Sequence, residues 1–220
     1  FRTETRAWLE ANCPGEMRLA LASEDDICWG GRNAVFTCDA QRVWLERMGA
    51  RGWTVPTWPR EYGGAGLSAD EAKVLAQEMR TLGCRMPLAS FGIWMLGPAL
   101  LKFGNEAQKR EHLPKIARGE IRWCQGYSEP GAGSDLAGLQ TRAEDKGDHF
   151  VLNGQKLWIT SAGEAGIFIV FANINPDAGY KGITAFSIER DFPGFRVGKR
   201  EDKCGIRASS TCELILEDVR

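Results

Sequence analysis

The sequence is poor in the residues that build common metal and nucleophilic sites. It contains two histidines, His112 and His149, and none of its seven cysteines forms a C-x-x-C pair. A zinc site is therefore not expected, and neither an H-E-x-x-H motif nor a Ser/His/Asp triad can be assembled. We predict that the chain has no metal ligands and that its cysteines are reduced thiols in a cytosol-like compartment.

Long apolar segments and an excess of either charge are also missing. The longest stretch without a formal charge, Met86 to Leu101, is shorter than the ~20 apolar residues that a bilayer requires, and Pro98 interrupts it. The 28 basic and 29 acidic residues leave a net charge of −1, so no general attraction to nucleic acid or to an anionic membrane is expected. The opening sequence, Phe1 to Glu4, is not typical of a secretory signal. We therefore expect no nucleic-acid partner and no membrane insertion.

The first 120 of the 220 residues have helical periodicity. A helix is predicted from Asp39 to Gly49 with Asp39 as its N-cap, and two more are predicted to begin at the capping patterns Ser68–Glu71 and Asn105–Gln108. The segment Pro87–Phe103 is apolar on nearly all sides, which predicts a helix that is buried on most faces.

A β-rich sequence follows Gly119. Asn153–Gly154 is a strong hairpin signal, so Phe150–Thr160 is predicted to be a pair of strands. Three further strands are predicted, at Ala165–Ile174, Gly182–Glu189 and Thr211–Glu217. Because a helical part precedes a β part without βαβ alternation, we predict an α+β fold of two domains, residues 1–120 and 121–220.

Two segments are notably rich in glycine. Gly52–Gly66 also contains prolines and tryptophans, which predicts an ordered loop. Glu129–Asp135 exposes several backbone amides, and either a structural turn or a loop against a ligand's phosphate or ring edge fits it. It is not a dinucleotide fingerprint, because Leu136 stands where a third glycine belongs. Trp158–Thr160, taken alone, is more typical of a buried strand.

Six segments resemble, in order and spacing, the acyl-CoA dehydrogenases, flavoproteins that desaturate acyl-CoA thioesters. They are Phe1–Leu9, Trp58–Gly66, Leu113–Glu120, Tyr127–Asp135, Asn153–Thr160 and Leu216–Val219. The resemblance implies an N-terminal all-α helical domain followed by a β-barrel-like middle domain that binds flavin and CoA. The front part is similar to bacterial dehydrogenases of larger or dicarboxylic acyl-CoAs, and the back part to the short- and branched-chain enzymes.

The resemblance also implies a set of residues that bind FAD. They are Gln125, Gly126, Tyr127, Ser128, Gly133, Ser134, Trp158, Ile159 and Thr160. Ser128 would hydrogen-bond the isoalloxazine, Trp158 would pack against the ring, and Thr160 would place its hydroxyl near the reactive nitrogen. Ser134 and Tyr180 would contact the CoA part of the substrate. Donors around the ring suit a cofactor that gains negative charge on reduction.

The implied reaction is α,β-desaturation of an acyl-CoA, with a hydride passing to flavin N5 and electrons leaving to an electron-transfer flavoprotein. The family's helical C-terminal bundle, which carries the catalytic carboxylate, is expected to be absent, so no catalytic residue is assigned. Glu129 is interpreted as structural. The 220-residue chain alone is expected to bind FAD weakly and to show no turnover.

The alternatives are an acyl-CoA oxidase of the same fold and a non-catalytic flavin- or CoA-binding subunit that a partner chain completes. The full-length enzyme is expected to be a homo-oligomer. A bacterial cytoplasmic location is expected, with the mitochondrial matrix as the alternative.

Overall fold

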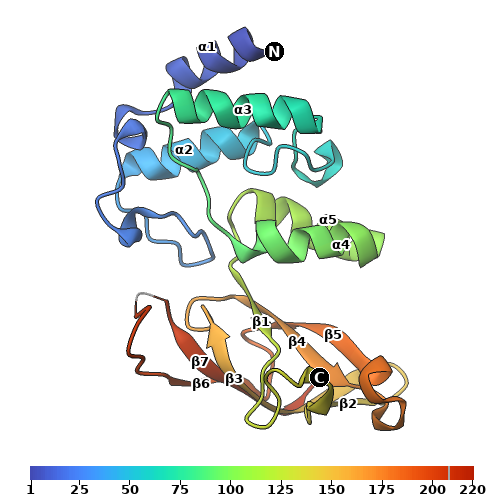
Figure 1. The fold of residues 1–220 in the computed structure, drawn as a ribbon. Helices are drawn as coiled ribbons and strands as arrows, with labels where there is room; N and C mark the ends of the chain where they lie inside the picture. The colour runs from blue at the N-terminus through green and yellow to red at the C-terminus, as the bar shows by residue number, and fades with distance from the viewer. Residues whose placement is uncertain (208) are drawn as a thin grey trace. The chain divides into compact units, whose positions relative to one another are not determined.

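The computed structural model describes residues 1–207 and 209–220. The chain divides into two compact units, Phe1–Arg122 and Trp123–Arg220 (Figure 1), which we call the helical unit and the β unit. No helix among the described residues combines the length and apolarity that spanning a membrane requires. In the same residues, no three His, Cys, Asp or Glu side chains gather as a metal site would need.

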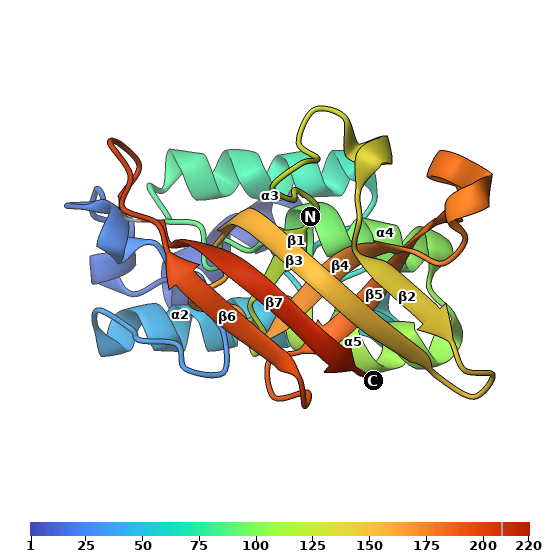
Figure 2. The same ribbon diagram turned by 90° about the horizontal axis from the view of Figure 1, so that it is seen from below.

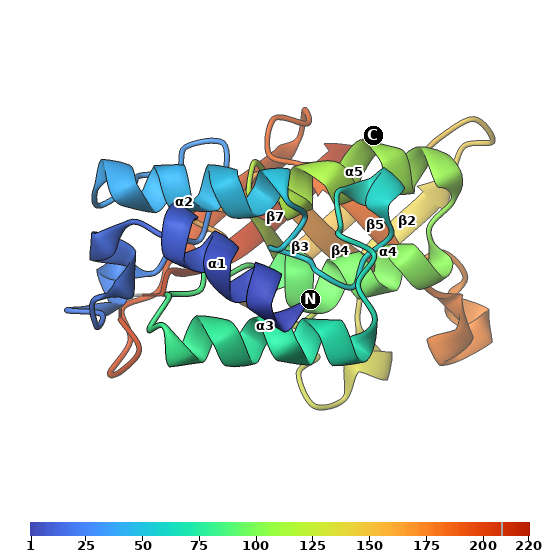
Figure 3. The same cartoon turned by 90° about the horizontal axis from the view of Figure 1, so that it is seen from above.

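The helical unit contains five α-helices joined by long, ordered connections. They are α1 (Arg2–Asn12), α2 (Asp39–Ala50), α3 (Ala69–Thr81), α4 (Gly97–Phe103) and α5 (Glu106–Ala117). Helix α1 lies over α2 and α3 (Figure 3), and the cluster between them includes Leu9, Trp44, Met48 and Leu75. Burial of these apolar side chains supplies the main driving force for the packing.

The two predicted capping boxes are confirmed. The Ser68 hydroxyl accepts from the Glu71 amide at 3.2 Å while the Glu71 carboxylate accepts from the Ser68 amide at 2.8 Å. Asn105 and Gln108 make the same reciprocal pair at the start of α5. The predicted cap at Asp39 is wrong, because Cys38 is the N-cap of α2. Asp39 instead accepts from the Arg42 guanidinium one turn later.

The predicted helix Pro87–Phe103 is wrong in extent and in burial. Its centre is a π-helical turn, Gly92–Leu96, followed by the short α4. Because Pro98 has no amide hydrogen to donate, the turn before it widens, and the Gly97 amide donates to the Gly92 carbonyl five residues back. Trp94 and Phe103 are 49% and 77% exposed, so the segment leaves a large apolar surface uncovered.

The loop Gly52–Gly66 is ordered, as predicted. Trp53, Trp58 and Tyr62 are all less than 10% exposed, and the Tyr62 hydroxyl donates to the Glu106 carboxylate at 2.8 Å. Gly64 allows the chain to close on itself, because a Cβ at this position would lie 2.1 Å from the Trp58 carbonyl oxygen.

The β unit is a curled mixed sheet that forms a half-barrel, which confirms the predicted α+β class. Its strands are β1 (Trp123–Gly126), β2 (Arg142–Asp145), β3 (Phe150–Thr160), β4 (Ile167–Asn173), β5 (Ile183–Glu189), β6 (Phe195–Arg200) and β7 (Thr211–Val219). The order is β1-β4-β2-β3-β7-β6, with β5 also paired to β4. Figure 2 shows β6, β7 and β3 side by side, with β4 and β5 running at an angle to them. The core of the unit is a cluster of buried side chains that includes Phe168 and Leu214.

The hairpin predicted at Asn153–Gly154 is wrong. Strand β3 continues through both residues, and the register with β7 shifts between Leu152 and Gly154. The Asn153 side chain is used across the sheet, where its amide group exchanges hydrogen bonds with Asp218. A Cβ on Gly154 would lie 2.8 Å from the Thr141 Cα, and its φ is +155°. Glycine is therefore required by close packing and not by a turn.

We expect Gly154→Ala to lower the free energy of unfolding of the β unit by about 1–3 kcal/mol, because the new methyl group meets backbone atoms that cannot rotate away. Gly131→Ala is the matched control, since its Cβ would have no neighbour within 4 Å. Urea denaturation of both variants measures the difference. Equal stability of the two variants would show that the contact with Thr141 is not tight.

Candidate functional site

The second glycine-rich segment, Glu129–Asp135, lies in a loop that begins where β1 ends, and we call this the glycine-rich loop. The Cα positions of Gln125 and Gly126 pair with those of Ile169 and Val170 in the parallel strand β4. The next residue, Tyr127, stacks its ring on Phe171 at 3.8 Å between centroids and 15° between planes. Strand pairing and ring stacking therefore fix the point at which the loop leaves the sheet.

The turn inside the loop is closed by backbone hydrogen bonds. The Glu129 amide donates to the Ala132 carbonyl at 2.9 Å, and the Ala132 amide donates back at 3.2 Å. Gly133 and Ser134, both exposed, follow this turn. Gly131 and Gly133 have open space where a Cβ would stand, whereas Ala132 between them is 1% exposed.

A buried ion pair fastens the loop to β3. The Lys156 ammonium lies 2.7 Å from the Glu129 carboxylate, with the two side chains 0% and 4% exposed. Lys156 also donates to the Tyr127 carbonyl at 3.1 Å. The same carboxylate accepts from the amides of Gln140 and Thr141 at 2.5 and 3.0 Å. Glu129 thus holds together the loop, β3 and the segment that leads into β2.

Burial raises the pKa of the Glu129 carboxyl, but the Lys156 ammonium and the hydrogen bonds from Thr141 and Gln140 outweigh burial and leave the pKa below its ordinary value. For Lys156, burial lowers the pKa, and the attraction to Glu129 opposes it only in part. Glu129 therefore stays ionised and fully engaged. A carboxylate with this many donors is a structural anchor and not a free base, which agrees with the structural role that the family resemblance implied for Glu129.

A pH dependence follows from the lowered pKa of Glu129. Relative to the unfolded chain, whose carboxyl titrates near ~4.3, the folded state stabilises the ionised form. This stability is present above ~pH 4.3 and is lost as the pH falls through the folded-state pKa. We expect the difference in unfolding free energy between the wild type and Glu129→Gln to shrink as the pH falls below ~4.3. Denaturation series at several pH values test this, and a difference independent of pH would contradict it.

The end of β3 lies beside the start of the loop. The Leu157 amide donates to the Ser128 carbonyl at 2.9 Å, so Ser128 and Trp158 are neighbours in space although 30 positions apart in the sequence. The register with β7 shifts again between Lys156 and Ile159. At this bulge Trp158 has φ +62°, and its side chain is 60% exposed.

Alternation resumes after the bulge. Ile159 is 3% exposed and pairs with Cys212, whereas Thr160 is exposed and pairs with Thr211. Tyr180 is 69% exposed in a separate helical segment between β4 and β5. Of the predicted residues, the structure therefore brings Gln125–Ser128 next to Trp158–Thr160. It leaves Gly133 and Ser134 on the open part of the loop.

Sequence reasoning missed Lys156 and the partners of Glu129. One signal was available, because Lys156 is two residues from Gly154 and four from Leu152, on the inward face of an alternating strand. A charged side chain on the inward face of a strand indicates a buried partner of opposite charge. The partner itself was not readable, since 27 residues separate the two side chains.

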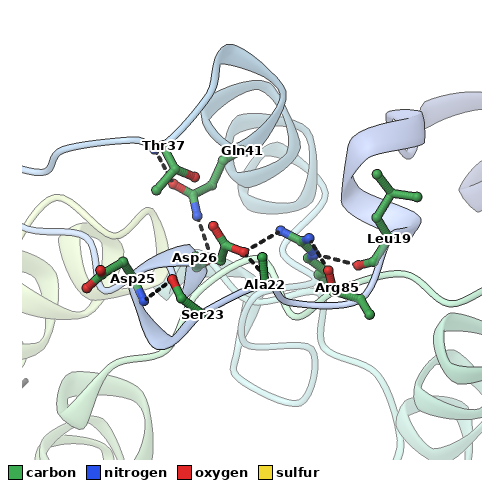
Figure 4. Close-up of polar contacts among 9 residues, drawn as sticks. Leu19, Ala22, Ser23, Asp25, Asp26, Thr37, Gln41 and Arg85 are labelled. Carbon is green, nitrogen blue, oxygen red and sulfur yellow. Dashed lines mark hydrogen bonds and ion pairs between the residues drawn. The ribbon is translucent and has the colours of Figure 1, made fainter.

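The helical unit has a cavity of its own, of about 320 Å³. Its walls are largely apolar, with Met17, Trp29, Trp44, Met86 and Trp94 among them. Its polar groups are engaged within the protein (Figure 4): Arg85 donates to the Leu19 carbonyl at 2.7 Å, and Gln41 donates to the Asp26 carbonyl at 2.8 Å. The cavity therefore suits an uncharged apolar group.

Two family models match most of the chain. The acyl-CoA dehydrogenase N-terminal domain matches residues 29–120, and the acyl-CoA dehydrogenase middle domain matches residues 124–219. The chain belongs to the acyl-CoA dehydrogenase family, which confirms the resemblance. It contains the family's N-terminal and middle domains and is close to the short- and branched-chain enzymes.

Individual relatives agree with this assignment. The chain is 40% identical over 183 residues to mitochondrial isovaleryl-CoA dehydrogenase of Pongo abelii, covering 81% of this chain and 43% of the relative. It is 41% identical over 177 residues to the mitochondrial short/branched chain specific acyl-CoA dehydrogenase of Bos taurus, covering 80% and 40%. The ChsE4-ChsE5 complex from Mycobacterium tuberculosis matches with a TM-score of 0.69 and 32% identity, covering 100% of this chain and 52% of that one. The chain thus spans half or less of the length of these curated relatives.

Proposed function

We propose that the β unit binds FAD and that the chain serves in the α,β-desaturation of a short- or branched-chain acyl-CoA. The observation that carries the proposal is Trp158, a large indole that is 60% exposed on a backbone with φ +62°. A flat ligand would remove the exposed indole surface from water, and a left-handed backbone, which is rare outside glycine, is concentrated at binding and catalytic sites. The residues present fit a flavin, since the exposed indole offers a flat wall and the neighbouring Ser128 and Thr160 offer hydroxyl groups.

FAD, when bound, supplies the chemistry by accepting a hydride from the substrate. The protein's part is to hold and orient the ring. Trp158 would cover one face of it, while Ser128 and Thr160 would donate hydrogen bonds to its polar edge, where negative charge develops on reduction. The Glu129–Lys156 pair would fix the loop that carries Ser128.

The substrate and the electron acceptor are inferred from the relatives. Isovaleryl-CoA and other short or branched acyl-CoAs are favoured by the names of the relatives that share 40 and 41% identity. Ser134 and Tyr180, both exposed, would contact the CoA part, and an electron-transfer flavoprotein would remove the electrons.

Equilibrium dialysis of the 220-residue chain against FAD tests the proposal. We expect saturable binding of one FAD per chain, with weak affinity, and weaker binding still of riboflavin, which lacks the phosphates that the loop amides would meet. Absence of saturable FAD binding would overturn the flavin assignment.

A second candidate is a subunit whose site is completed by a partner chain, which the likeness to the ChsE4-ChsE5 complex favours. In that case FAD binding would tighten strongly when the partner is added. Dialysis with and without a candidate partner separates the two functions, because the FAD affinity of a chain that acts in a homo-oligomer should not change when a different subunit is added.

A further inference from the structure

The apolar cavity of the helical unit has room for a ring system. Its volume is about 320 Å³, at the lower end of the range for small-molecule sites. In another protein, a dry engineered cavity of about 150 Å³ binds benzene, so this cavity fits an apolar molecule of about two rings. Its lining residues lie between Met17 and Trp94 in the sequence, so the cavity belongs to the helical unit alone.

Part of the wall is preformed by buried apolar side chains. Met17 and Trp44 line the cavity and are 2% and 1% exposed. The Trp44 indole N–H donates to the Arg85 carbonyl at 3.0 Å, so its polar atom is already satisfied within the protein. Trp44 therefore offers a carbon surface to a ligand, and the flexible thioether of Met17 adapts to the shape of a neighbouring ring.

The exposed part of the wall is apolar as well. Trp94 and Met86 also line the cavity, yet they are 49% and 65% exposed. The Trp94 ring lies edge-on to Trp29, another lining residue, with 6.1 Å between centroids. Phe91 lies against both rings, at 6.3 Å from Trp94 and 5.7 Å from Trp29. A bound ring system would remove part of this aromatic surface from water.

The π-helical turn Gly92–Leu96 fixes the backbone of Trp94. The Ser90 hydroxyl accepts from the Gly92 amide at 3.1 Å, and the Ser90 carbonyl accepts from the Trp94 amide at 3.2 Å. Ser90 is itself 2% exposed, so the start of the turn is anchored in the interior. Single π-helical turns are frequent at functional sites, and this one carries an aromatic side chain of the cavity wall.

Among the described residues that line the cavity, the polar side chains are those of Asp26, Gln41 and Arg85. All three are engaged within the protein. Arg85 donates to the Ala20 carbonyl at 2.7 Å, the Asp26 carboxylate accepts from the Ala22 amide at 2.8 Å, and Gln41 donates to the Asp26 carbonyl (Figure 4). The charges of Arg85 and Asp26 also lie 3.9 Å apart and compensate each other. A charged ligand would therefore lose its hydration without gaining a partner.

We propose that this cavity is a binding site for an uncharged apolar molecule of about two rings, which packs against Trp44 and Trp94. The volume sets the size of the ligand, the indole rings favour a flat aromatic or fused-ring shape, and the engaged polar groups exclude charge. The proposal concerns the helical unit and does not rest on the function proposed for the β unit.

Titration of the ¹⁵N-labelled 220-residue chain with naphthalene tests the proposal. The ring currents of bound naphthalene should shift the indole N–H signals of Trp44 and Trp94 in a saturable way, while the signal of Trp53, which lies outside the lining, stays in place. Naphthalene sulfonate has the same rings and a fixed negative charge, so it should bind at least about tenfold more weakly. Absence of saturable shifts, or equal affinity for the two ligands, would overturn the proposal.

Two variants locate the ligand. Ala89→Phe fills the cavity, which Ala89 lines while 7% exposed, and should abolish naphthalene binding. Trp94→Ala removes a half-exposed part of the wall, so the chain should fold while its affinity for naphthalene falls about tenfold. Phe103→Ala is the matched control, because Phe103 is an aromatic residue of α4 that is 77% exposed and lies outside the lining. Equal affinities of Trp94→Ala and Phe103→Ala would show that naphthalene binds elsewhere and would overturn the proposal. No FAD is present in these titrations, so their outcome is independent of the flavin assignment.

Discussion

Replacing Glu129 by alanine is expected to lower the free energy of unfolding of the β unit by about 3–5 kcal/mol. The substitution leaves the Lys156 ammonium buried with no counterion, and it removes the acceptor of the Gln140 and Thr141 amides. Each uncompensated buried group carries a desolvation cost. Hydrogen exchange of the β3 amides measures the change within this unit alone.

The matched control for this variant is Glu144→Ala, which removes the partner of Lys146 in an exposed pair whose side chains are 68% and 42% accessible. Exposed pairs contribute at most ~1 kcal/mol, so this variant should be close to the wild type. The double variant Glu129→Gln with Lys156→Met should recover part of the loss, because no buried charge remains. If Glu129→Ala lowers the free energy of unfolding no more than Glu144→Ala does, the ion pair between Glu129 and Lys156 does not anchor the loop.

Trp158→Ala is expected to weaken FAD binding by about 10- to 100-fold, since it removes the flat wall against which the ring would stack. The stability of the protein without FAD should change by less than ~1 kcal/mol, because the indole is 60% exposed and its backbone, at φ +62°, is strained for any non-glycine residue. Dialysis against FAD and urea denaturation measure the two effects separately.

Phe192→Ala is the control, because Phe192 is an aromatic residue of the same unit that is 37% exposed and lies outside the predicted flavin residues. It should leave FAD affinity unchanged. An unaltered affinity in Trp158→Ala, or a large loss of stability without FAD, would indicate that Trp158 has a structural role only.

Local signals in the sequence were reliable where a short-range contact determines the structure. The capping boxes at Ser68 and Asn105 need only partners three residues away, and both formed. The strand predicted at Thr211–Glu217 also formed, as β7. For the capping boxes, the partners that determine the structure lie within a few residues of each other, and for β7 the local pattern of residues was enough to indicate a strand.

Sequence signals failed where contacts with a distant part of the chain determine the local structure. Asn153–Gly154 favours a turn locally, but β3 pairs with β7 on both sides of these residues and continues through them, with a shift in register. Lys156 was overlooked because its partner comes from another segment. The exposure of Trp158 could not be predicted from the pattern of β3 either, since a bulge reverses the alternation. Its place in the candidate site came from the family resemblance.

Titration of the ¹⁵N-labelled chain with FAD, followed through the indole N–H signals of its eight tryptophans, tests the central claim most directly. The Trp158 signal is identified by its absence from Trp158→Phe. We predict that FAD shifts this signal in a saturable way and leaves the signals of the buried Trp44 and Trp53 in place. If FAD binds while the Trp158 signal does not move, the flavin does not lie at the end of β3.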